Sequence, residues 1–263
     1  MQQARDLLEE GDELNDMLIQ LKPSDWQRKT PFKGWSVNDV ITHLHASDRV
    51  AVIALSDPEK LREIVSQWLT PEEVLLNGII TGLPTLESGP ALREQWHKCL
   101  NKLCALLNDL DPSLRIPWYG PDMSARMFTT ARQMETWAHG QDIYDLLKVR
   151  RLYSDRIKNI VVIGVRTFGW SFALRGLEIP NDEPYLCLTA PSGAVWEWNE
   201  PNATNQIEGS AAEFCHVVTQ GRNIADTSLK VVGDTASHWM SIAQCFAGNV
   251  AVPPAPGERA WNT

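Results

Sequence analysis

Paired cysteines are absent from this sequence of 263 residues. The five cysteines are an odd number, and no two of them form a C-x-x-C pair; they are Cys99, Cys104, Cys187, Cys215 and Cys245. Zinc–thiolate sites use such pairs, and disulfide frameworks use an even number of cysteines. We therefore expect reduced thiols in a cytoplasmic protein, and neither a disulfide framework nor a zinc–thiolate site.

Positive charge and long apolar runs are scarce as well. The 24 Lys and Arg residues are outnumbered by 33 Asp and Glu residues, which gives a net charge of −9. Nucleic-acid binding needs a basic surface. No run of about 18 apolar residues occurs, so no membrane span is expected. The polar, acidic residues 1–14 do not resemble a signal peptide. Nucleic acid and membranes are therefore not expected as partners.

The sequence does contain enough apolar material for a core, with 43% hydrophobic residues and 11 tryptophans. Apolar residues recur at helical spacing through the first half. The expected helices cover residues 4–21, 36–55, 91–110 and about 123–148, and residues 59–80 look helical with an interruption at Thr70-Pro71. Ser36, followed three residues later by Asp39, resembles a capping box. We predict an antiparallel four-helix bundle for residues 1–152.

The pattern changes after residue 152, and residues 153–250 are predicted to form a small α+β domain. We expect one helix over 157–175, strands over 185–189, 195–198 and 229–232, and helices over 211–219 and 237–246. Ser192-Gly193 suits a hairpin turn between the first two strands. The proline-rich residues 251–263 are expected to form an extended tail. The fold class predicted for the whole chain is α+β.

Glu135 and His139 are the most informative pair of residues. A carboxylate and an imidazole four residues apart on a helix share one face. His43 lies about 90 residues earlier on another predicted helix, and two packed helices would bring it to this pair. The result would be a two-histidine, one-carboxylate site with open positions, which suits zinc or iron. Asp142 lies on nearly the same face and would orient a ligand histidine.

Spacing alone leaves a plainer interpretation open. A histidine beside an apolar stripe is usually a hydrogen-bonded core residue, and a Glu/His pair at this spacing is often part of a solvated helix face. The neighbouring His45 lies roughly 200° around the helix from His43, so it cannot share the role of His43.

Several short motifs occur together: Gly34-Trp35-Ser36-Val37, Thr42-His43-Leu44, Ala131-Arg132, and Glu135-x-Trp137-x-His139 with Asp142. This set resembles the mycothiol-dependent maleylpyruvate isomerase-like proteins, which belong to the wider DinB-like metal-binding bundles. The resemblance implies a DinB-like four-helix bundle that holds a divalent metal, typically zinc. It also implies His43, Glu135 and His139 as the ligands, and a small C-terminal α+β domain of sterol-carrier type.

Three short segments in the second half of the chain resemble the C-terminal domain of the same family: Glu208-Gly209-Ser210-Ala211, Gly221-Arg222 and Val232-Gly233-Asp234. The resemblance implies that a C-terminal arginine contributes to activity. Arg222 is the candidate, and a structural arginine in a turn is the alternative.

The segment from Trp118 to Arg126 departs from the isomerase pattern, which leaves the maleylpyruvate substrate open. Trp118, Tyr119 and Arg126 precede the Glu135 helix and are candidates for lining a substrate pocket. Packing between the two domains is the alternative role for these side chains.

The function implied by the resemblance is a divalent-metal-dependent enzyme that acts on a small carbonyl or carboxylate metabolite. It would be an isomerase, or a cyclase or transferase, with the metal as Lewis acid and a low-molecular-weight thiol as a co-reactant. We expect a small-molecule substrate and a monomer or homodimer. Two alternatives stay open: a module that binds an apolar ligand and has a structural metal, and a hydrolase that uses metal-bound water.

Overall fold

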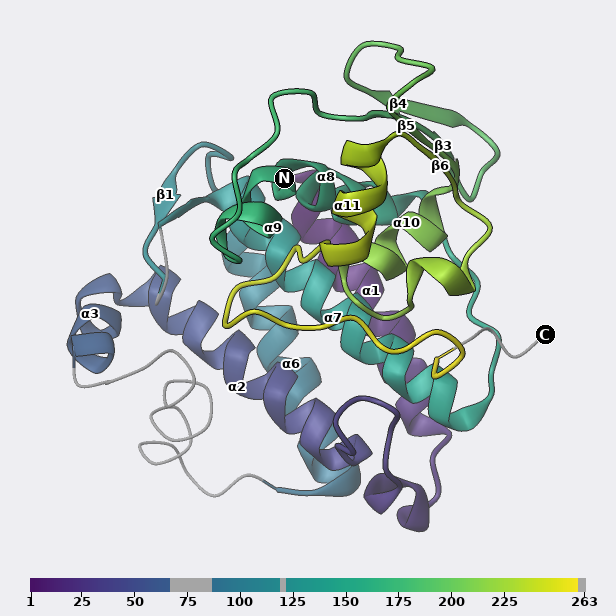
Figure 1. Ribbon diagram of the computed structural model, residues 1–263. Coiled ribbons are helices and arrows are strands. Elements are labelled where there is room, and N and C mark those ends of the chain that lie inside the picture. Colours follow the sequence, from purple (N-terminus) through teal and green to yellow (C-terminus); the bar gives the residue numbers. More distant parts are fainter. Residues whose placement is uncertain (67–86, 119–121, 260–263) are drawn as a thin grey trace. The chain divides into compact units, whose positions relative to one another are not determined.

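The computed structural model describes residues 1–66, 87–118 and 122–259. The chain divides into two compact units, Met1–Val149 and Arg150–Thr263; the boundary expected from the sequence lies three residues later. The first unit is helical and the second contains a mixed β-sheet, as Figure 1 shows, so the predicted α+β class is confirmed. No helix among the described residues is long and apolar enough to cross a membrane.

Long helices make up most of the first unit (Figure 1). They are α1 (Gln2–Ile19), α2 (Val37–Ser56), α6 (Gly89–Asn108) and α7 (Ala125–Leu147). Helix α6 packs against α1 and α2, and α7 packs against the same two helices. The predicted helical bundle is therefore present in the described residues.

Shorter elements connect these helices. They are the 3-10 helix η1 (Pro23–Gln27), helix α3 (Pro58–Ser66) and the strands β1 (Arg115–Ile116) and β2 (Met123–Ser124). The two strands pair antiparallel, and the sequence predicted no strand in this unit. The predicted interruption at Thr70-Pro71 lies outside the described residues.

The start of α2 follows from its sequence. Ser36 Oγ accepts a hydrogen bond from the backbone N–H of Asp39, and Asp39 Oδ2 accepts one from the backbone N–H of Ser36. This reciprocal arrangement satisfies donors that a helix N-terminus leaves open, and it confirms the predicted capping box. Ile41 and Leu44 then turn into a core that also contains Trp96 and Phe128. The helix therefore begins, and faces inward, where its sequence predicts.

The second unit has a four-stranded sheet among its described residues, in the order β4-β3-β5-β6. Strands β3 and β4 pair antiparallel, β3 and β5 parallel, and β5 and β6 antiparallel. Helix α10 packs against β5, and α11 packs against β6. The strands are β3 (Tyr185–Thr189), β4 (Val195–Trp198), β5 (Gln206–Ser210) and β6 (Lys230–Val232). The helices are η3 (Asp155–Ile157), α8 (Lys158–Arg166), α9 (Phe168–Ala173), α10 (Ala211–Val218), η4 (Ile224–Asp226) and α11 (Asp234–Ile242).

Three sequence predictions for this unit were wrong in detail. The single helix expected over 157–175 is broken at Thr167, whose hydroxyl donates to the carbonyls of Ile163 and Gly164. Strand β5 was not predicted. Helix α11 begins three residues earlier than expected, directly after Gly233, whose φ of +95° turns the chain out of strand β6.

Candidate metal centre

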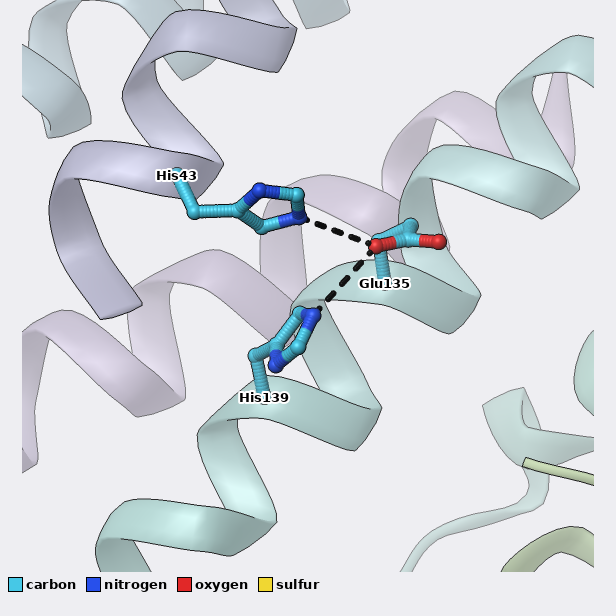
Figure 2. Close-up of side chains that lie close together, drawn as sticks. All are labelled: His43, Glu135 and His139. Carbon is cyan, nitrogen blue, oxygen red and sulfur yellow. Dashed lines mark hydrogen bonds and ion pairs between the residues drawn. The ribbon is translucent and has the colours of Figure 1, made fainter. Parts of the chain in front are cut away.

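His43, Glu135 and His139 lie together in the first unit, as Figure 2 shows. His43 Nε2 lies 3.2 Å from Glu135 Oε2, and His139 Nε2 lies 3.5 Å from the same oxygen. The ligand atoms of all three side chains lie within 4.8 Å of one another. The structure thus brings together the three residues that the sequence singled out as ligands.

Helix geometry explains how the three side chains meet. Glu135 and His139 are four residues apart on α7, so they point to the same side of that helix. His43 projects from α2, which packs against α7. The side chains of His43, Glu135 and His139 are 16%, 24% and 12% exposed. The cluster is therefore sheltered but remains accessible from solvent.

The distances fit a small divalent metal. Ligand atoms about 2.1 Å from a tetrahedral zinc lie about 3.4 Å from one another, and the two distances between Glu135 and the histidines are close to that value. Imidazole nitrogen and carboxylate oxygen are ordinary zinc ligands. Three protein ligands leave a coordination position for water or substrate, as in catalytic zinc sites. The donor set therefore fits a catalytic metal better than a structural one.

The electrostatics of the cluster keep Glu135 in its charged form. Burial by itself raises the pKa of Glu135, but hydrogen bonds and charge from His139 and His43 outweigh burial and hold this pKa well below its usual range. Burial by itself lowers the pKa of His139, but hydrogen bonds with Asp142 and Glu135 raise it to about 9. Burial lowers the pKa of His43, and its hydrogen bond with Glu135 offsets this only in part. Glu135 is thus ionised and ready to bind a cation.

Asp142 contacts the far side of the His139 ring. Its Oδ2 lies 3.2 Å from His139 Nδ1, while His139 Nε2 faces Glu135. A carboxylate on one ring nitrogen fixes the proton there and leaves the other nitrogen as the metal ligand. This contact is the one that the orienting role suggested for Asp142 requires.

Two aromatic side chains that sequence analysis did not assign to the site form one wall of it. The ring of Trp35 stacks on His139 with centroids 5.7 Å apart and lies 5.3 Å from His43. Phe32 meets His139 edge-on at 4.9 Å. Both side chains come from the turn before α2, where Thr30 N–H donates to Trp35 carbonyl oxygen at 2.7 Å. The available signal was Trp35 in the Gly34-Trp35-Ser36-Val37 motif.

The other predicted site residues lie in different surroundings. Trp118 packs edge-on against Phe128, with ring centroids 5.0 Å apart. Arg126 is exposed in the first turn of α7. It precedes Glu135 by nine residues, about 13 Å along the helix and half a turn away in direction. Tyr119 lies outside the described residues.

Arg222 belongs to the second unit. It is buried, and one of its terminal nitrogens donates to Gly221 carbonyl oxygen at 2.8 Å. Its charge, with those of Arg151 and Arg259, lowers the pKa of the buried His216 after the larger effect of burial.

His45 does not join the cluster, as its direction on α2 predicts. It is buried, and burial together with the charge of Arg49 lowers its pKa to about 4.

The chain is similar in sequence to a known family and to two proteins. The family model of the mycothiol maleylpyruvate isomerase N-terminal domain matches residues 7–144. Two uncharacterised proteins from strains of Mycobacterium tuberculosis are 35% identical over 253 residues, which is 96% of this chain and 96% of each relative.

Solved structures with a similar fold include the mycothiol-dependent maleylpyruvate isomerase and a histidine-to-alanine variant of it, each with a TM-score of 0.52. They are 13% and 14% identical in sequence, and each comparison covers 82% of this chain and 87% of the other. At this identity the likeness concerns the fold.

The fold and the cluster define an α+β protein with a helical unit that carries a candidate divalent-metal centre. The chain belongs to the mycothiol maleylpyruvate isomerase N-terminal domain family.

Proposed function

We propose that this protein is a divalent-metal-dependent enzyme that acts on a small carbonyl or carboxylate metabolite. The reaction is an isomerisation, or a cyclisation or group transfer, with a low-molecular-weight thiol as co-reactant. The observation that carries the proposal is the His43–Glu135–His139 cluster, whose donor distances suit zinc and whose side chains remain partly exposed. Family membership supports the enzyme class and the use of a thiol.

His43, Glu135 and His139 are the side chains that would hold the metal, and zinc is the metal that this donor set favours. When bound, the metal supplies Lewis-acid chemistry for a carbonyl oxygen or for a thiol sulfur. Asp142 keeps the proton on His139 Nδ1, which leaves Nε2 as the donor. Phe32 and Trp35 exclude water from one side of both imidazoles.

Substrate contacts are proposed from the remaining candidates. Trp118 and Tyr119 precede α7 and are proposed to line the substrate pocket, and Arg222 is proposed to contribute to catalysis. The proposal for Arg126 has the least support, because its place on α7 is about 13 Å along the helix from Glu135 and on the opposite face.

Metal analysis of the purified protein tests the core of this proposal. We expect close to one zinc per chain in the wild type, and loss of most of it in His43→Ala, Glu135→Ala and His139→Ala. The matched control is His97→Ala, since His97 also pairs with a carboxylate, Asp12, at 2.6 Å but lies outside the cluster. A wild type that binds no divalent metal would rule out the proposal.

The reaction class needs a separate measurement. We expect turnover of small unsaturated keto- or carboxylic acids to require both the metal and an added thiol such as mycothiol. Turnover that needs the metal but no thiol would instead support hydrolysis by metal-bound water. Retained zinc with no turnover and a tightly bound apolar ligand would support a binding module.

A further inference from the structure

A buried ion pair joins α2 to α7 next to the candidate metal centre. Arg132, on α7, donates from Nε and from Nη2 to Asp48 Oδ1 on α2, both at 3.1 Å. Trp96, on α6, donates from Nε1 to Asp48 Oδ2, also at 3.1 Å. The side chains of Asp48 and Arg132 are 0% and 5% exposed. One fully buried carboxylate thus links three helices.

The ion pair and the metal-ligand cluster lie side by side along the same two helices. Asp48 follows His43 by five residues on α2, which is about 7.5 Å of helix, and Arg132 precedes Glu135 by three residues on α7, about 4.5 Å. From the His43–Glu135 contact to the Asp48–Arg132 contact, the chain runs forward along α2 but backward along α7. The two helices therefore pack antiparallel. The register that pairs Asp48 with Arg132 is also the register that places His43 opposite Glu135.

A buried ion pair such as Asp48–Arg132 is expected to add little to the free energy of folding. Removing two charges from water costs about as much free energy as their attraction returns, and apolar residues of similar volume often serve equally well. What a buried pair does control is alignment, because any other register would leave Asp48 charged in the core without a partner. The pair therefore penalises sliding of α2 along α7.

We propose that the Asp48–Arg132–Trp96 network is a positioning device for the metal centre. It holds α2 and α7 in the alignment that points His43 at Glu135 before any metal binds. His43 is the ligand that depends on this alignment, since Glu135 and His139 share one helix and keep their spacing without it. This inference rests on the proposed function, because it concerns the affinity of the same site for metal.

The test compares zinc affinity with fold stability in variants of the full chain. The main variant is Asp48→Leu/Arg132→Met/Trp96→Phe, which removes the polar network without leaving a buried charge unpaired. A second variant, Asp48→Asn/Arg132→Gln, keeps polar groups at both positions and loses the charges. The matched control is Arg93→Met, because Arg93 makes a part-buried bond of 2.7 Å to Asn15 that joins α6 to α1 instead.

We expect the triple variant to unfold cooperatively, to bind zinc about tenfold more weakly than wild type, and to give a cobalt absorption spectrum of altered intensity. Arg93→Met is expected to match wild type in both metal readouts. The proposal is overturned if the triple variant folds and binds zinc as tightly as wild type. If the triple variant does not fold, the same comparison with the second variant decides. A wild type without zinc affinity contradicts the proposed function instead, and the wild-type titration shows this by itself.

Discussion

His139 is the residue on which the candidate centre depends most. Its two ring nitrogens face two different carboxylates, Glu135 on the metal side and Asp142 on the other. The ring also packs against Phe32 and Trp35, which restrict its rotation. His43 contacts Glu135 through one nitrogen, and its ring is tilted against that of Trp35. Both histidines are thus held by Glu135 and by packing on Trp35, and His139 has a second carboxylate, Asp142, on its other nitrogen.

We expect Asp142→Asn to weaken zinc binding by about tenfold, because a neutral amide holds the Nδ1 proton less firmly than a carboxylate. Zinc titration monitored with a competing chelator measures the change. Asp145→Asn is the matched control, since Asp145 lies three residues further along α7 and accepts a bond from Gln141 at 2.9 Å. Equal zinc affinity in Asp142→Asn and wild type would show that Asp142 does not orient the ligand.

The start of α2 matters at the scale of the element, because this helix carries both His43 and Asp48. Its N-terminus is fixed by the Ser36 and Asp39 capping box. Backbone bonds between Arg28 and Val37 and between Thr30 and Trp35 close the preceding turn. Lys33 and Gly34 both have positive φ in this turn, at 49° and 66°. The helix and the aromatic wall of the metal centre therefore begin from one rigid segment.

Ser36→Ala should lower the free energy of unfolding by about 1 kcal/mol, because it removes a buried cap that accepts the N–H of Asp39. Urea denaturation of the metal-free protein gives the value. The comparison is Ser124→Ala at the start of α7, where the serine accepts a single bond from Met127 N–H at 3.3 Å without a capping box. A smaller loss in Ser36→Ala than in Ser124→Ala would contradict this account.

The features that could be predicted from the sequence are those that depend on residues close together in the chain. Apolar spacing located the helices of the bundle, and the Glu135–His139 pair was visible because both residues lie on one helix. Strand β5 was missed because Ile207 is the one strongly apolar residue in Gln206–Ser210, although the strand is an inner one of the sheet. Its strand conformation comes from pairing on both sides with β3 and β6.

Partners that are distant in the sequence could not be predicted in the same way. The bond between Asp48 and Arg132 spans 84 residues, and nothing in either local sequence distinguishes a buried charge from an exposed one. The contacts of Trp35 with His43 and His139 likewise depend on how α2 packs against α7. The ligands were nevertheless identified because the resemblance to a family supplied the link between the two helices.

At the scale of the whole molecule, the two units differ in the chemistry of their buried histidines. His216 in the second unit is fully buried, and the Tyr153 hydroxyl lies 2.8 Å from its Nε2. Burial, followed by the charges of Arg222, Arg151 and Arg259, lowers its pKa well below the usual value. The folded chain therefore keeps this imidazole neutral at a pH where the unfolded chain protonates it.

This difference in protonation between the two states makes the folded chain less stable at lower pH. Well above about pH 6.5 the histidine is neutral in both states and contributes nothing, whereas at lower pH the unfolded state binds a proton that the folded state does not. The wild type should therefore lose about 1.4 kcal/mol of stability through this group between pH 7.5 and 5.5. We expect His216→Gln to reduce the difference in free energy of unfolding between these two pH values by that amount. An unchanged difference in urea denaturation would show that His216 is protonated in the folded chain.

The metal centre lies within one unit, and this leads to a prediction for a fragment. All three candidate ligands, Asp142, the aromatic wall and the Asp48–Arg132 pair fall within Met1–Val149, which has its own hydrophobic core. We therefore expect residues 1–149, expressed alone, to be helical by circular dichroism and to bind zinc with the affinity of the intact chain. The same fragment with His139→Ala is the control and should bind no zinc. A fragment that is helical but binds zinc much more weakly than the intact chain would show that the second unit shapes the metal site, and Arg222 would be the first residue of that unit to substitute.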